Sequence, residues 1–159
     1  MQMNEGVEWA AHFCLLLHWL EEDDPRPIPG ARLAEVYDLP PAYVGKQLQA
    51  LTRAGLTRSV PGRHGGLLLA RPAAEITLMD VVAAIEGTEE AFRCTEIRRR
   101  GINAERPARE FTSPCGIAMA MKSAELAWRR ELASTTISDL AERTPSRAAA
   151  AARRHFTHL

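Results

Sequence analysis

Two of the three cysteines, Cys94 and Cys115, are the residues whose positions first suggest chemistry. They flank a long charged segment, and Cys115 stands in the run Pro-Cys-Gly-Ile, where a helix is expected to begin. A helix N-terminus favours the thiolate, which is the form of cysteine that binds metal. An odd number of cysteines argues against a disulfide framework and favours a metal-binding or redox role. The third, Cys14, lies in an apolar helix and is predicted to be a core residue.

Two further potential ligands, Glu8 and His12, are four residues apart in the first predicted helix. At ~3.6 residues per turn they share one face, about 40° apart, whereas Cys14 points about 240° from Glu8. Iron–sulfur clusters and zinc usually take four protein ligands. Geometry therefore favours a site that combines this glutamate and histidine with Cys94 and Cys115 over one that uses all three cysteines. Taken alone, the pattern is equally compatible with an exposed Glu8 and His12 and with cysteines that bind nothing.

The elements that must position these residues are predicted to be mainly helical, with one small β-hairpin. Apolar periodicity, caps and prolines predict helices over 7–20, 29–37, 41–53, 77–87, 114–132 and 137–141. Two short strands, over 56–60 and 67–70, surround a turn rich in glycine. A charged, irregular loop of this length, over 88–113, is often functional.

Two short helices joined by a tight turn and followed by a hairpin predict a winged helix-turn-helix, whose second helix enters the major groove. Side chains of types that reach base edges or phosphates are the candidate DNA contacts. They are Arg32, Tyr43, Lys46, Gln47 and Gln49 around the helices, and Arg63 and His64 at the hairpin tip. The alternative for each residue is a solvated surface side chain that contacts no DNA. The order of the elements predicts a protein that binds double-stranded DNA.

The net charge of zero conceals an uneven distribution. The sum is −6 over 1–25, +5 over 26–71, −5 over 72–92 and +6 over 93–159. The first positive block coincides with the predicted helix-turn-helix and hairpin. Ordinary solvated faces are one interpretation. The other interpretation is a positively charged DNA-binding surface that is confined to one segment.

Length and composition restrict the class of protein. A chain of 159 residues that is 46% hydrophobic and 25% charged suits one domain with a helical arm, and excludes a disordered chain. No apolar run approaches the ~18 to 20 residues that cross a bilayer, and the N-terminus lacks the basic region of a secretory signal. A cytoplasmic protein without a membrane partner is expected. No glycine-rich nucleotide loop, Cys-x-x-Cys or Ser/His/Asp pattern supports an enzyme.

Several segments resemble the Rrf2 family, the IscR-type transcriptional regulators of bacteria. The matching segments are 31–35, 41–56, 62–66, 69–72, 75–82, 86–87 and 136–140, with Trp128 and Leu132. Two departures are Leu67, where an aromatic residue is common, and Glu8, where many members are basic. The resemblance implies a winged helix-turn-helix domain over 1–87, a cluster-binding loop over 88–113 and a dimerisation helix with a short C-terminal helix over 114–142. The remaining tail, 143–159, is expected to be a frayed helix or disordered.

The segments around the candidate ligands resemble the RsrR branch of that family, whose [2Fe–2S] cluster is held by two cysteines, a histidine and a glutamate. These segments are 7–10 with His12, 92–98 and 114–118. The resemblance implies one cluster per subunit, held by Cys94 and Cys115 of one subunit and by Glu8 and His12 of the other. It implies a redox-sensing regulator that binds a pseudo-palindromic operator as a homodimer. A zinc-binding or thiol/disulfide regulator without a cluster is the alternative.

Overall fold

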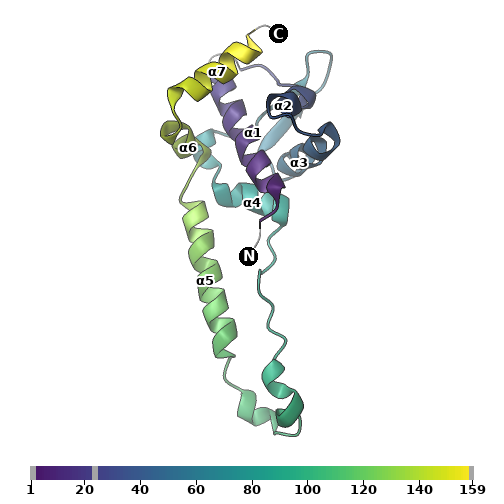
Figure 1. Cartoon of the computed structure of the whole chain (residues 1–159), viewed down its shortest axis with the longest axis vertical. Coiled ribbons are helices and arrows are strands. Elements are labelled where there is room, and N and C mark those ends of the chain that lie inside the picture. Colours follow the sequence, from purple (N-terminus) through teal and green to yellow (C-terminus); the bar gives the residue numbers. More distant parts are fainter. Residues whose placement is uncertain (1–2, 23–24, 158–159) are drawn as a thin grey trace.

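Helix α1 (Glu5–Glu21) is the centre of the core, and the other helices of the head surround it (Figure 1). The computed structural model describes residues 3–22 and 25–157. We call residues 3–87 and 134–157, as far as they are described, the head, and residues 88–133 the arm. The position of α1 follows from its composition, because a helix that is apolar on most sides is stable when it is covered. Phe13, Leu17 and the predicted core residue Cys14 are all fully buried.

Helices α2 (Gly30–Val36) and α3 (Pro41–Arg53) form the predicted helix-turn-helix. Asp38 takes a left-handed conformation in the turn between them (φ 49°), and Pro41 begins α3. The apolar face of α3, which includes Val44 and Leu51, packs against α1 and α4. The opposite face of α3, which includes Tyr43 and Lys46, stays in solvent.

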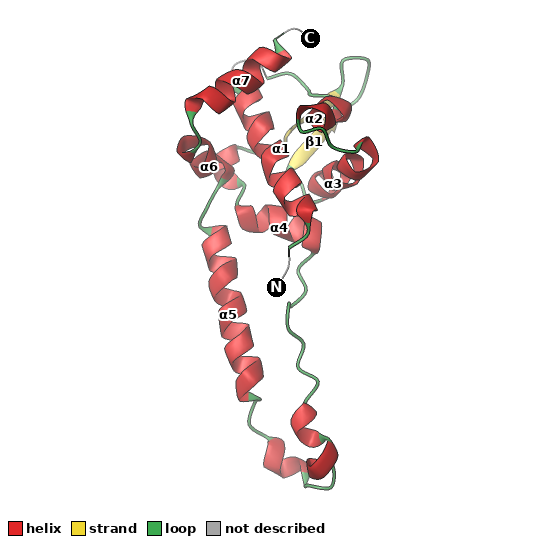
Figure 2. Ribbon diagram, viewed as in Figure 1, coloured by secondary structure: helices red, strands yellow, loops and turns green. Residues whose placement is uncertain are grey.

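Strands β1 (Thr57–Val60) and β2 (Gly66–Leu69) pair antiparallel and form the wing (Figure 2). Strand β1 begins one residue later than predicted, at Thr57. Strand β2 begins and ends one residue earlier than predicted, at Gly66 and Leu69. On its other edge, β2 accepts the backbone of Ile28, through N···O distances of 3.0 and 2.8 Å to Leu67. A Cβ atom at Gly66 would lie 2.3 Å from the carbonyl carbon of Ile28, so this close approach requires glycine.

Helices α4 (Leu78–Glu86) and α6 (Ile137–Arg143) begin side by side, α4 just after the short turn η1 (Ala73–Glu75). Both begin in capping boxes. In each, a threonine side chain accepts a hydrogen bond from the amide of an aspartate three residues later, and that aspartate's carboxylate accepts one from the threonine amide. The two caps, Thr77 and Thr136, are joined by a backbone bridge. This bridge joins the segment that follows the arm to the start of α4 in the head.

The arm consists of the segment 88–115 and of α5 (Gly116–Ala133), and the two protrude from the head together (Figure 1). Three short turns, η2 (Ile97–Arg99), η3 (Gly101–Asn103) and η4 (Ala108–Phe111), form its far end. Helix α5 begins at Gly116, later than predicted, because Cys115 has extended backbone angles and serves as the N-cap. No described residue of α5 is buried. Neither α5 nor any other described helix is long and apolar enough to cross a membrane.

The chain after α6 forms a helix, α7 (Ser146–Phe156), where the sequence analysis expected frayed or disordered structure. Its alanines favour a helix, and Phe156 anchors it with 1% of its surface exposed. Arg153 adds two bonds to the end of α1, from Nε to the Trp19 carbonyl (3.0 Å) and from its guanidinium to Glu22 (2.6 Å). The last two residues of the predicted tail, 158 and 159, lie outside the described residues.

Candidate functional site

The structure brings Cys94 and Cys115 together at the far part of the arm. Their sulfur atoms and a carboxylate oxygen of Glu96 all lie within 4.8 Å of one another. Cys94 is exposed and Cys115 is half-buried, and both are free thiols. The two cysteines flank the loop in sequence, and the pairing of 88–113 with α5 makes them neighbours in space.

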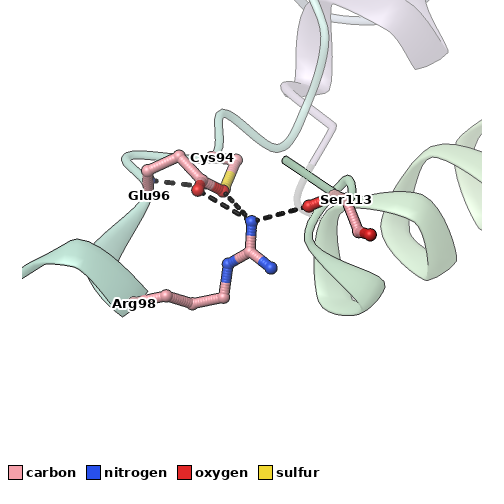
Figure 3. Close-up of polar contacts among 4 residues, drawn as sticks. All are labelled: Cys94, Glu96, Arg98 and Ser113. Atoms are coloured by element: carbon pink, nitrogen blue, oxygen red, sulfur yellow. Dashed lines mark hydrogen bonds and ion pairs between the residues drawn. The ribbon is translucent and has the colours of Figure 1, made fainter. Parts of the chain in front are cut away.

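Glu96 is the member of this cluster that the sequence analysis missed. Its backbone is left-handed (φ 50°, ψ 45°), an uncommon conformation for a residue with a side chain. The turn directs both its amide and its carboxylate at Cys94, with the amide 3.4 Å and Oε1 3.5 Å from Sγ (Figure 3). The spacing Cys-x-Glu was visible in the sequence, but nothing there showed the left-handed turn.

Arg98 ties this cluster to the other side of the arm. One guanidinium nitrogen donates to both carboxylate oxygens of Glu96, at 3.1 and 2.8 Å, and to the carbonyl of Ser113, at 3.1 Å (Figure 3). The hydrogen bonds from Arg98 hold the pKa of Glu96 below its usual range. Because Ser113 lies two residues before Cys115, these bonds hold the segment around Glu96 next to the segment around Ser113. The two thiols therefore lie side by side.

The two thiols differ in their electrostatic surroundings. Backbone N–H groups of Ala118 and Ile117, at the start of α5, outweigh partial desolvation and lower the pKa of Cys115. At Cys94 the Glu96 amide favours the thiolate, but desolvation, the Glu96 carboxylate and Cys115 together raise the pKa above its ordinary value. Two thiols held this way, one of them biased toward the thiolate, are suitable ligands for a thiophilic metal.

Glu8 and His12 lie in another part of the same chain. Both are exposed on α1, in the head, and His12 stacks obliquely against Tyr37 with ring centroids 5.5 Å apart. They are absent from the cluster of potential ligands that the described residues form on the arm. The predicted four-residue site is therefore not assembled within one subunit.

Most of the predicted DNA-contacting side chains lie on the outer face of α3 and on the wing. Tyr43 is 63% exposed, and the remaining members of this surface are exposed as well. They are Lys46 and Gln49 on α3, and Arg63 and His64 at the tip of the wing. A tyrosine, a lysine and a glutamine on one helix, beside a basic hairpin, can contact bases and phosphates together.

Gln47 and Arg32 differ from this expectation. Gln47 is only 8% exposed, and its amide packs against Gly6 so closely that a Cβ atom there would lie 2.7 Å away. It joins α3 to α1 and does not face solvent. Arg32 is half-buried and forms an ion pair with Glu35 at 2.7 Å. Neither is placed as an open DNA-contacting side chain.

Comparison with known proteins finds relatives of this chain. A family model described as Rrf2, an iron-dependent transcriptional regulator, matches residues 3–143. The protein aau3 of Rhizobium meliloti (strain 1021) is 39% identical over 113 residues, which cover 71% of this chain and 69% of aau3.

Solved structures show the same fold. CymR of Staphylococcus aureus, in its oxidized form, is 27% identical with a TM-score of 0.62, covering 91% of this chain and 99% of CymR. IscR of T. potens is 16% identical with a TM-score of 0.64, covering 92% of this chain and 90% of IscR. The second likeness concerns the fold alone. The winged-helix head with its protruding arm is therefore a shared architecture.

Proposed function

The chain belongs to the Rrf2 family of transcriptional regulators, which are not enzymes, and from this premise we propose that it is a redox-sensing regulator. In this proposal it binds a pseudo-palindromic DNA site as a homodimer in the cytoplasm. It holds a [2Fe–2S] cluster at each of the two contacts between an arm and the partner's head. The observation that carries the proposal is the separation of the four candidate ligands, with two thiols on the arm and two exposed ligands on the head.

The arm supports a dimeric assembly. Helix α5 exposes a series of large apolar side chains, among them Ile117 at 68%, which is unusual for a surface that stays in water. The other members are Met119, Met121 and Leu126. A second copy of α5 covers such a surface with matching chemistry, since a two-fold interface is made of the same patch on both subunits.

The ligand set supports a cluster bound between subunits. Cys94 and Cys115 supply two of the four ligands that such a group usually requires. Glu8 and His12 are exposed on one face of α1, so they remain open to ligands from a second copy. This is the set expected from the RsrR branch. When bound, the cluster supplies one-electron chemistry, and ligation by a neutral histidine in place of a thiolate raises its potential.

The candidate ligand Glu8 lies close to a side chain proposed to contact DNA. Trp9, next to the ligand Glu8, contacts Tyr43 on the exposed face of α3. A shift of α1 against the arm therefore changes the surroundings of a DNA-contacting side chain. Such a switch requires two DNA-binding geometries that differ in free energy with the state of the site.

The test is to purify the protein anaerobically, record its visible spectrum and assay iron and acid-labile sulfide. We expect a coloured protein with about one [2Fe–2S] cluster per subunit. His12→Ala and Glu8→Ala should alter the spectrum or shorten its lifetime, whereas Glu5→Ala, an exposed acid in the first turn of α1, should not. A colourless protein without sulfide after reconstitution contradicts the cluster. Unchanged spectra in both ligand variants contradict the ligand set.

A second candidate is a zinc-binding or thiol-based regulator. It is favoured by one observation, the proximity of Cys94, Glu96 and Cys115 within a single subunit. Two thiolates and a carboxylate form three of the four positions of a zinc site. Alternatively the two thiols form a disulfide, releasing two electrons and two protons to an external oxidant. Glu96→Gln should then weaken zinc binding, while Glu8→Ala and His12→Ala leave it unchanged.

A further inference from the structure

Helix α7 lies beyond the region matched by the family model, which ends at residue 143. We propose that its C-terminal end extends the DNA-binding surface, with Arg154 contacting a backbone phosphate beside the wing. This inference rests on the proposed DNA-binding function. It assigns a role to a helix that neither the ligand cluster nor the helix-turn-helix uses.

The end of α7 is tied through its own backbone to the segment that pairs with the wing. The carbonyl of Phe156 accepts a hydrogen bond from the Arg26 guanidinium. Two residues further along, Ile28 pairs with Leu67 of β2. Figure 1 shows the C-terminal end of α7 and the turn of the wing at the same end of the head. The end of α7 therefore lies near the wing, which is itself a candidate DNA contact.

The side chains of α7 divide into an anchoring set and a free basic set. Phe156 is buried, and Arg153 is bonded to Trp19 and Glu22, so these two fix the helix on α1. Arg154 is exposed and forms no ion pair within the described residues, and His155 beside it is exposed too. The helix contains no acidic residue. A positive end held rigidly on the core is suited to an anion, because anchoring reduces the entropy lost on binding.

Double-stranded DNA is the occupant that the surroundings favour. The wing presents Arg58 on β1 and Arg63 at its tip, and both are exposed, as Arg154 is, so exposed arginines stand on the wing and at the end of α7. Arginine binds phosphate through a planar fork of donors. A contact of this kind positions the protein on the duplex and contributes salt-dependent affinity without reading sequence.

The experiment measures affinity against salt for a duplex that the wild-type protein selects from a random-sequence library. Arg154→Ala should weaken binding several-fold and reduce the slope of log K against log salt by about 0.9, the value for one phosphate contact. The matched control is Arg147→Ala. Arg147 lies on the same exposed face of α7, seven residues back toward α6, and should leave the slope unchanged. Thermal melting of both variants establishes that α7 remains folded.

Two results overturn the inference. One is an unchanged slope for Arg154→Ala in a folded protein. The other is an equal loss for Arg147→Ala, which would show a diffuse effect of charge and no local contact. Lys46→Ala distinguishes this failure from a failure of the proposed function. If Lys46→Ala weakens binding and Arg154→Ala does not, then only the role of α7 is wrong; if the wild-type protein selects no duplex, the DNA-binding proposal itself fails.

Discussion

Trp9 packs edge-on against Tyr43, with ring centroids 6.5 Å apart and ring planes at 78°. The contact joins α1, next to the candidate ligand Glu8, to the exposed face of α3. Tyr43 is 63% exposed, so most of the residue remains in solvent despite this contact. The relationship places one side chain of the head between the proposed cluster ligands and the proposed DNA surface.

This contact predicts energetic coupling between the two residues. Trp9→Ala should weaken DNA binding, because Tyr43 loses a ring contact of about 0.5 to 1.5 kcal/mol that holds its orientation. The measurement is a double-mutant cycle with Trp9→Ala and Tyr43→Ala, read out as DNA affinity. We expect the double variant to bind better than the sum of the single losses. Strict additivity would show that Trp9 does not act through Tyr43.

The chain has two lysines, Lys46 on α3 and Lys122 on α5, and they make a matched pair. Lys46→Ala should lower DNA affinity and reduce the salt slope by about 0.9, because one phosphate contact is lost. Lys122 lies on the arm beside Glu90 and should have no effect on binding to the same duplex. Salt titrations of both variants test this. Equal slopes for Lys46→Ala and the wild type would move the DNA surface away from α3.

The three thiols should react at different rates in the reduced, metal-free protein. Cys115 has a lowered pKa and Cys94 a raised one, so at neutral pH a larger fraction of Cys115 is thiolate. Burial raises the pKa of Cys14 to about 12, and its side chain has no exposed surface. Iodoacetamide labelling followed by mass spectrometry should show the order Cys115, Cys94, Cys14. Rapid labelling of Cys14 in the folded protein would contradict the buried first helix.

The predictable part of the fold came from patterns within a few residues. The apolar stripes of α3 and α4, the threonine–aspartate capping pair Thr77 and Asp80, and the proline that starts α3 all act locally. The grouping of Cys94 and Cys115 as candidate ligands rested on their residue type and on the helix start at Cys115, which are local features too. These features depend little on the rest of the chain, so the sequence predicts them well.

The unpredicted part depends on contacts between distant segments. Gln47 looked like a base-reading side chain, but Gly6 of α1 leaves a space that its amide fills. Glu96 enters the cluster through a left-handed turn, where Arg98 donates both to Glu96 and, across the arm, to the Ser113 carbonyl. Helix α7 becomes ordered because Phe156 reaches the core. Each depends on a partner that sequence spacing does not reveal.

Two glycines predict opposite effects on stability. Gly66→Ala places a Cβ atom 2.3 Å from the backbone of Ile28, which cannot move without breaking the wing ladder, so we expect a loss of about 1 to 3 kcal/mol. Gly45 lies within α3, and a methyl group added there would have no neighbouring atom within 4 Å, so Gly45→Ala should stabilise by about 0.5 to 1 kcal/mol. Urea unfolding of both variants measures the difference. A neutral Gly66→Ala would contradict the three-way pairing of Ile28, β2 and β1.

The capping box of α6 predicts a pH-dependent stability. The amide and hydroxyl of Thr136 donate to the Asp139 carboxylate at 2.8 and 2.7 Å, and these bonds lower the pKa of Asp139 below its ordinary 3.8. Because the ionised form is favoured in the folded state, this stability is present above the ordinary pKa and lost as pH falls through the folded value. Asp139→Asn should therefore lower Tm near neutral pH, and the difference from wild type should shrink in acid. Glu142→Gln, in the same helix but outside the cap, is the control. A Tm difference for Asp139→Asn that stays constant with pH would show that the carboxylate charge does not stabilise the start of α6.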